Sequence, residues 1–222
     1  RECSIQRRHQ KLVEIAPAPG LNEQLRDMLC NAAVKLAKET RYKNLGTFEF
    51  LVDRNQEASD EHAFSFIEAN ARLQVEHTVT EKVTGIDLVQ LQILLAGGSS
   101  LSKLRISSPV ELRGYAIQMR VNMERMDLDG TARYSGGTLT AFTLPDNESI
   151  RTDTYGYVGY STNPRYDSLL AKLIVHETLG GFDEALQRAE QALSDFKIEG
   201  VETNLPFLQN LIKHPKFRNG TW

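Results

Sequence analysis

The sequence is poor in cysteine, in long apolar runs and in net charge. Its 222 residues include only two cysteines, Cys3 and Cys30, with no CxxC pair and no Cys/His cluster. We therefore expect two reduced thiols of a cytosolic protein, and neither a disulfide framework nor a zinc site. No apolar stretch approaches the length of a membrane span and no signal-peptide pattern opens the chain, so we expect no membrane partner. A net charge of -3 argues against nucleic acid as a partner.

The remaining composition is that of an ordinary globular protein, with 41% apolar and 25% charged residues. Apolar spacing predicts a helix over 22–39, strands over 46–53 and 63–70 joined by a polar turn, and a helical pattern from Thr78 to Gly97. Further strands are predicted over 113–143, a strand or short helix over 166–176, and helices over 181–195 and 203–213. The fold class is α+β, with domains at 1–100 and 113–222 and a linker at 101–112.

The stretch "FIEANARLQVEHTVTE" (66–81) carries a polar residue at every second position. Residues two apart in a strand point to the same face, so Glu68 and Asn70 project together. Glu49 lies in the neighbouring predicted strand, between two phenylalanines. Two carboxylates and an amide oxygen that meet across a hairpin would suit Mg²⁺ or Mn²⁺. The alternative is that Glu49 and Glu68 are merely solvent-facing strand positions.

Two further charged residues follow this register at once. Arg72 presents a planar fork that fits a small oxyanion, and Glu76 suits a general base. The alternative interpretation is an Arg–Glu pair on the surface. Thr78 to Glu81 has the capping-box pattern of a helix start. The basic segment that opens the chain, with Gln6, His9 and Lys11, could neutralise phosphates or be a solvated face.

Several long motifs together resemble the biotin carboxylase family. They are "RECSIQRRHQK", "EIAPAPG", "GTFEF", "FIEANARLQVEHTVTE" and "VTGIDLVQLQ", followed by "GYAIQMRVN", "IRTDTYGYVGY" and "YDSLLAKLIVH". They occur in the family's order and spacing and cover essentially the whole chain. The resemblance implies the second half of an ATP-grasp domain plus the biotin carboxylase C-terminal domain. It also implies a ligase that carboxylates biotin with bicarbonate and ATP, using Mg²⁺ or Mn²⁺.

The resemblance also implies roles for individual residues. Metal would be held by Glu49, Glu68 and Asn70, and bicarbonate by Arg72, Gln74 and Val75. The nucleotide would contact Gln6, His9, Lys11, Leu51, Glu49 and Glu68. The catalytic residues would be Glu76, Arg72, Lys11 and Arg151, with Glu76 as the base that deprotonates bicarbonate and Arg151 stabilising the biotin enolate. The segment before Arg151, "LPDNESIR", lacks the glycine-rich turn that the family usually has there.

Family membership implies partners outside this sequence. We expect a biotin carboxyl carrier domain, a carboxyltransferase domain, and a homo-oligomer, located in the cytoplasm or, in a eukaryote, the mitochondrial matrix. The family's N-terminal domain and its phosphate-covering lid do not fit within 222 residues. We therefore expect a fragment of a longer protein that by itself binds ATP weakly and is inactive.

Two other functions stay open at this point. One is another ATP-grasp ligase, such as half of a carbamoyl-phosphate synthetase, which shares the metal register and bicarbonate phosphorylation. The other is a non-catalytic fragment that serves as a dimerisation module. The "RLQVEH" stretch and the region around Arg151 favour a biotin carboxylase over a carbamoyl-phosphate synthetase, and Glu76→Gln in a full-length protein would discriminate against the non-catalytic fragment.

Overall fold

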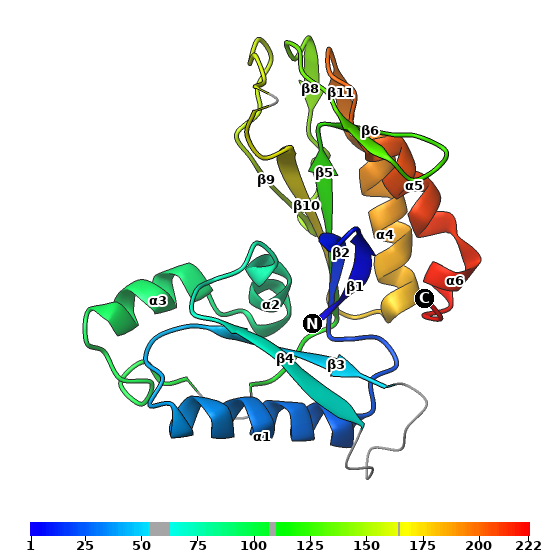
Figure 1. The fold of residues 1–222 in the computed structure, drawn as a ribbon. Coiled ribbons are helices and arrows are strands. Elements are labelled where there is room, and N and C mark those ends of the chain that lie inside the picture. Colours follow the sequence, from blue (N-terminus) through cyan, green and yellow to red (C-terminus); the bar gives the residue numbers. More distant parts are fainter. Residues whose placement is uncertain (54–62, 107–109, 164) are drawn as a thin grey trace. The chain divides into compact units, whose positions relative to one another are not determined.

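A computed structural model describes residues 1–53, 63–106, 110–163 and 165–222 (Figure 1). The chain forms two compact units, and each is described by itself. Unit 1 consists of residues 1–19, 78–84 and 112–222, and unit 2 of residues 20–77 and 85–111. These units are not continuous in sequence, because the first 19 residues belong with the C-terminal half. The predicted domains, 1–100 and 113–222 with a linker at 101–112, have other bounds than these two compact units. The domain division stays a prediction. The polar turn predicted at 54–62 lies outside the described residues.

Unit 1 is built on a five-stranded antiparallel sheet of order β1-β2-β5-β10-β9. Its strands are β1 (Glu2–Arg7), β2 (Gln10–Ala16), β5 (Tyr115–Asn122), β10 (Leu169–Glu177) and β9 (Ile150–Thr154). The pairing of β2 with β5, from Val13 opposite Met119 to Ala16 opposite Ala116, explains why the N-terminal segment joins this unit.

Helices cover both faces of this sheet. On one face, α4 (Phe182–Asp195) and α5 (Leu205–Lys213) bury Leu186, Leu193 and Leu208 against strand residues such as Met119 and Leu173. On the other face, α2 (His77–Thr84) packs Val79 and Val83 against Ala16, Ala116 and Ile174. Because β10 is buried on both faces, its sequence is apolar apart from Lys172 and its last two residues, which is why its pattern left strand and short helix open.

Short elements complete unit 1. The hairpin of β6 (Glu124–Met126) and β7 (Ala132–Tyr134) turns at Asp127–Gly130. β8 (Ala141–Thr143) pairs with β11 (Lys197–Glu199), and α6 (Pro215–Arg218) follows α5.

Unit 2 contains the second sheet and two helices. β3 (Thr47–Val52) and β4 (Phe64–Asn70) form the predicted antiparallel pair. α1 (Glu23–Glu39) follows its N-cap Asn22, whose side chain accepts a hydrogen bond from the Gln24 amide at 2.7 Å. Of its predicted apolar stripe only Leu25 is buried. A two-stranded sheet offers too little surface to cover a helix of this length.

The region after Glu76 differs from its prediction. The capping box is wrong, because α2 begins at His77 and Thr78 therefore lies inside the helix. The helical pattern is also split, since Gly85 takes a positive φ of 69° and α3 (Leu88–Ala96) starts anew at its N-cap Asp87. Among the helices of the described residues, none has the length and apolarity that a membrane crossing requires.

Candidate functional site

The two candidate metal-binding carboxylates lie directly opposite each other on neighbouring strands. Glu49 of β3 pairs with Glu68 of β4 in the antiparallel register, with a register shift immediately after it. Opposite residues of an antiparallel pair project to the same face, about 5 Å apart at Cβ. Two like charges in this position repel each other unless a cation or hydrogen-bond donors compensate them. The hairpin therefore places two carboxylates next to each other.

Two amides compensate part of this charge. Asn70 Nδ2 lies 2.7 Å from Glu68 Oε1 and 3.4 Å from Glu49 Oε1, so one amide reaches both carboxylates. Gln74 Nε2 donates a hydrogen bond to the same Glu49 oxygen. The four side chains thus form one connected cluster within unit 2. It joins the predicted metal residues to Gln74, which was predicted to hold bicarbonate.

This donor set fits a hard divalent cation. The Asn70 amide group lies where it contacts both carboxylates, and turning it by 180° would present its oxygen in place of its nitrogen. That would give three oxygen donors, which is the chemistry that Mg²⁺ prefers. Throughout the described residues, no group of three or more His, Cys, Asp and Glu side chains is placed to hold a metal. An ion at this hairpin would therefore need the amide oxygen as well as the two carboxylates.

The segment after β4 separates an exposed arginine from a buried glutamate. The side chain of Arg72 is exposed and donates one hydrogen bond, from Nη1 to the Leu73 carbonyl at 3.2 Å. Glu76 is 2% exposed. Between them the Gln74 carbonyl accepts a hydrogen bond from the His77 amide at 3.1 Å, which closes a turn. Leu51 on β3 is 67% exposed, and Val75 is also exposed.

The predicted nucleotide-binding residues Gln6, His9 and Lys11 lie on a hairpin of unit 1. Gln6 of β1 is opposite Lys11 of β2, and His9 is in the two-residue turn with Arg8. Both turn residues have positive φ, 46° and 69°, which is the geometry of tight hairpin turns that Asn-Gly usually provides. The sequence analysis missed this hairpin because Arg-His gives no such signal. The predicted nucleotide contact and catalytic role of Lys11 stay predictions.

Arg151 lies in unit 1 on β9 and is surrounded by acidic groups. Its Nε and Nη2 bind both oxygens of Asp153 at 2.7 and 3.1 Å, and its Nη1 binds Glu81 at 2.8 Å. Burial alone would lower the pKa of Arg151, but the hydrogen bonds to Asp153 and Glu81 outweigh it and raise the pKa above its usual value. The cationic form is therefore secured at every physiological pH.

A buried polar network anchors the start of α2 and was missed by the sequence analysis. The Thr78 hydroxyl donates to Gln118 Oε1, and Gln118 Nε2 donates to Glu14 at 2.8 Å. Glu14 is 0% exposed and also accepts a hydrogen bond from Arg120 Nε at 2.6 Å. A buried carboxylate needs such partners, because it has lost its hydration. Thr78 is thus tied to the sheet two residues after Glu76.

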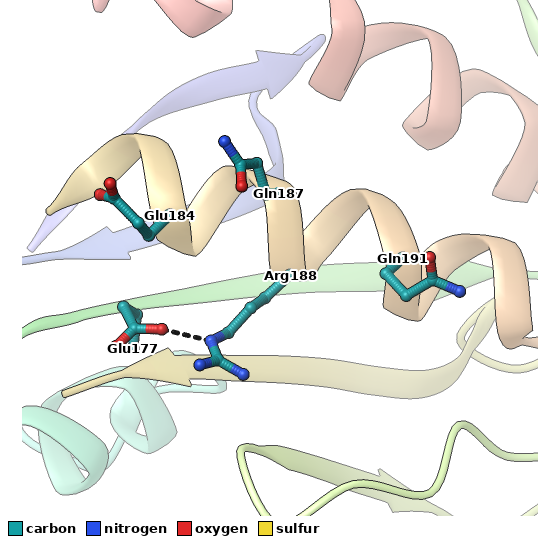
Figure 2. Close-up of a pocket in the computed structure, with 5 residues that line it drawn as sticks. All are labelled: Glu177, Glu184, Gln187, Arg188 and Gln191. Atoms are coloured by element: carbon teal, nitrogen blue, oxygen red, sulfur yellow. Dashed lines mark hydrogen bonds and ion pairs between the residues drawn. The ribbon is translucent and has the colours of Figure 1, made fainter. Parts of the chain in front are cut away.

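A surface pocket of about 310 Å³ lies on α4, and none of its lining residues is a predicted site residue. Its lining side chains are Glu177, Glu184, Gln187, Arg188 and Gln191 (Figure 2). Arg188 Nε donates to Glu177, and the same carboxylate accepts from the amides of Leu179 at 3.0 Å and Gly180 at 3.1 Å. These contacts lower the pKa of Glu177 to about 2. The pocket is thus lined by an ion pair that is already satisfied.

Comparisons with known proteins match the whole chain. Residues 1–104 match the model "Carbamoyl-phosphate synthase L chain, ATP binding domain", and residues 118–222 match "Biotin carboxylase C-terminal domain". Over 221 residues the chain is 46% identical to the biotin carboxylase of Halalkalibacterium halodurans, covering 99% of this chain and 46% of that protein. The chain belongs to the biotin carboxylase family.

Other relatives are also biotin-dependent carboxylases or domains of them. The chain is 43% identical to the pyruvate carboxylase of Bacillus subtilis, over 100% of its own length and 19% of that protein. A solved structure of the 2-oxoglutarate carboxylase biotin carboxylase domain dimer from Hydrogenobacter thermophilus, in complex with MgADP, ADP and bicarbonate, superposes with a TM-score of 0.88. It is 42% identical, with 98% of this chain and 46% of that chain covered. The chain spans about half the length of the biotin carboxylases that it matches.

Membership in the biotin carboxylase family confirms the predicted family and α+β class. The two relatives named above are a biotin carboxylase and a pyruvate carboxylase, and each matches nearly the whole chain, which favours the biotin carboxylase prediction over the carbamoyl-phosphate synthetase alternative. The individual site residues are not tested by these comparisons, and their roles stay predictions.

Proposed function

We propose that this chain supplies part of the active site of an ATP-dependent biotin carboxylase, acting within a biotin-dependent carboxylase. The observation that carries the proposal is the hydrogen-bonded cluster of Glu49, Glu68, Asn70 and Gln74 in unit 2. It combines the ligands of a hard cation with an amide suited to an oxyanion. The solved relative with MgADP and bicarbonate supports this combination of ligands.

The cation would be held by Glu49, Glu68 and Asn70. Bound Mg²⁺ or Mn²⁺ would neutralise phosphate charge on ATP. Leu51 would lie against the adenine, and Gln6, His9 and Lys11 would contact the nucleotide. Each of these is a proposal supported by the match of the corresponding motif to the family.

Bicarbonate would be bound by Arg72, Gln74 and the backbone at Val75. The exposed guanidinium of Arg72 offers its forked donors to an oxyanion. Glu76 would accept the proton of bicarbonate, whose oxygen then attacks the γ-phosphorus of ATP and displaces ADP. The product is carboxyphosphate. Holding both reactants on one scaffold makes this step effectively unimolecular.

Biotin would be carboxylated after carboxyphosphate breaks down to CO₂ and phosphate. The released phosphate would accept the proton of the ureido nitrogen of biotin, and Arg151 would stabilise the negative charge that develops on the ureido oxygen. The nitrogen then bonds to CO₂. Biotin would arrive on a carboxyl carrier domain and deliver the carboxyl group to a carboxyltransferase domain. The multi-domain relatives support these partners.

The test is a chimera in which this chain replaces the matching segment of the H. halodurans biotin carboxylase. Substituting Glu76→Gln removes the general base while keeping its shape. We expect biotin carboxylation and bicarbonate-dependent ATP cleavage to fall together by about 10²–10⁴-fold. Glu39→Gln, at the exposed end of α1, is the matched control and should keep the parent rate. If Glu76→Gln retains the parent rate, the proposed base is wrong.

A further inference from the structure

The hairpin of β1 and β2 carries polar side chains on both of its faces. In the antiparallel register Gln6 lies opposite Lys11. The next pair, beside the turn, is Arg7 with Gln10. Residues opposite each other in an antiparallel pair project to the same side, and neighbours along a strand project to opposite sides. Gln6 and Lys11, both predicted to contact the nucleotide, therefore share one face, and the pair beside the turn shares the other.

The hairpin of β1 and β2 has little support from the sheet itself. β1 stands at one end of the strand order, and within the described residues it pairs with β2 alone. In the turn, Arg8 and His9 both have positive φ, which residues with a side chain adopt only at a cost. Such a conformation persists where surrounding contacts hold it. Contacts beside the turn therefore decide where His9, the third predicted nucleotide residue of the hairpin, lies.

Arg7 connects this turn to a buried carboxylate on another element of unit 1. Its Nη2 donates to Gln10 Oε1 at 2.9 Å, across the turn, and lies 3.3 Å from Glu124 Oε2. Glu124 is the first residue of β6, and its side chain is 1% exposed, whereas that of Arg7 is 17% exposed. Arg7 Nε is buried and, within the described residues, has no hydrogen-bond partner. The attachment of Arg7 thus depends on its Nη2 group and on the charge of Glu124.

A hydroxyl group holds the other oxygen of the same carboxylate. Ser168, directly before β10, donates from Oγ to Glu124 Oε1 at 2.6 Å. The Ser168 carbonyl also accepts a hydrogen bond from the Met123 amide at 2.8 Å, so the two segments are joined through the backbone as well. Ser168 and Glu124 are both buried. Because a buried carboxylate has lost its hydration, it needs such partners, and Glu124 is held from two sides.

We infer that Glu124 and Ser168 are positioning residues, which act through Arg7 to hold the β1–β2 hairpin in the form that binds the nucleotide. This rests on the proposed nucleotide contacts of the three hairpin residues predicted above. The attachment lies on the hairpin face opposite Gln6 and Lys11, so it does not occupy the face that carries them. A hairpin that is already ordered loses less conformational entropy when the nucleotide binds.

Amide hydrogen exchange of the 222-residue chain tests the positioning without any activity measurement. Glu124→Gln keeps the shape of the side chain and removes its charge. We expect the backbone amides of residues 6–11 to exchange at least about 10-fold faster, relative to those of residues 171–175 in β10, because the hairpin opens more often. Glu202→Gln is the matched control, since this exposed carboxylate pairs with Arg125, the neighbour of Glu124, and should leave the exchange unchanged. An equal change in both segments, or no change in either, overturns the inference.

A second variant keeps the test decisive where Glu124→Gln does not fold. Ser168→Ala removes one hydrogen bond to the carboxylate and leaves its charge beside Arg7. We expect the amides of residues 6–11 to exchange about 3-fold faster in this variant, again relative to β10. Exchange equal to that of the parent chain overturns the inference.

The second measurement uses the chimera and separates two substrates. We expect Glu124→Gln to raise KM for MgATP about 10-fold, while KM for free biotin stays within about 2-fold of the parent value. A lower rate with an unchanged KM for MgATP would show a merely structural role and overturn the inference. If His9→Ala leaves KM for MgATP at the parent value, the proposed nucleotide contact of the hairpin fails, and the positioning role fails with it. Faster exchange in Glu124→Gln would then show only that Glu124 orders the hairpin.

Discussion

At the scale of single residues, the site is defined by polar groups that compensate one another. Glu49 and Glu68 face each other across two strands, and the amides of Asn70 and Gln74 bind them. Amides are neutral, so these hydrogen bonds hold the two carboxylates without neutralising them. A cation that displaces the Asn70 nitrogen would gain both carboxylates at once. Cation binding at this hairpin is therefore a property that the 222-residue chain should show by itself.

We expect Glu49→Gln and Glu68→Gln each to weaken Mn²⁺ binding by about 10-fold or more, because each removes one of two charged ligands. Mn²⁺ titration followed by electron paramagnetic resonance measures this directly. Glu39→Gln is the control, since this residue is exposed at the end of α1. Unchanged Mn²⁺ affinity in both site variants would count against the metal assignment.

A second residue-scale prediction concerns Glu177, whose pKa is lowered to about 2, first by Arg188 and then by two backbone amides. A lowered folded-state pKa means that the ionised carboxylate stabilises the fold. This contribution is complete above the unfolded pKa, near 4.5, and is lost as the pH falls toward 2. The stability difference between the parent and Glu177→Gln should thus be large at pH 6 and clearly smaller at pH 3.

Urea unfolding at the two pH values measures that difference. Glu148→Gln, an exposed carboxylate in the loop before β9, is the matched control and should change stability little at either pH. A parent–variant difference that stays the same at pH 6 and pH 3 would contradict the assignment of the stabilising carboxylate to Glu177.

At the scale of elements, the sheet of unit 1, which carries the predicted site residue Arg151, is fixed in place because helices cover both of its faces. α4 covers one face and α2 the other, as the two separate core clusters show. β9, which carries Arg151, is an edge strand bound to β10. The position of Arg151 therefore depends on the packing of β10, whose apolar side chains contact helices on both sides.

The packing of α4 can be tested with a pair of leucines. Leu186 of α4 is 0% exposed, whereas Leu179 in the preceding turn is 97% exposed. Replacing Leu186 by alanine leaves a cavity and should lower the free energy of unfolding by about 2–5 kcal/mol. Leu179→Ala should change it by less than about 0.5 kcal/mol. Thermal or urea unfolding measures both, and similar values for the two variants would show that α4 does not pack as described.

At the scale of the whole molecule, the chain forms two units that each hold a subset of the predicted site. Unit 2 carries the residues predicted to bind metal and bicarbonate, and unit 1 carries the predicted site residues Gln6, His9, Lys11 and Arg151. The chain also spans about half the length of its biotin carboxylase relatives.

We accordingly expect the 222-residue chain alone to bind MgATP more weakly than micromolar, since it spans about half the length of these relatives. Isothermal titration calorimetry measures this, and the chimera of full length provides the comparison. Micromolar affinity of the isolated chain would mean that the residues described here suffice to bind the nucleotide.

The sequence alone predicted much of the local structure and the meeting of Glu49, Glu68 and Asn70 across a hairpin. Strand alternation placed Glu68 and Asn70 on one face, and the structure gives Glu49 the opposing position. This succeeded because the two-residue period of a strand is a local property of the chain. The turn of Arg8 and His9 was missed, because only its dihedral angles, and no residue preference, reveal it.

What the sequence by itself determined was which residues share a strand face, and which family the motifs belong to. Only the tertiary structure decided that β2 pairs with β5, that Thr78 binds Gln118, and that Glu81 reaches Arg151. Alternation and helical period act over a few residues, so they fix the direction of a side chain. The partner of that side chain depends on how distant segments pack, and that is set by burial of the whole core.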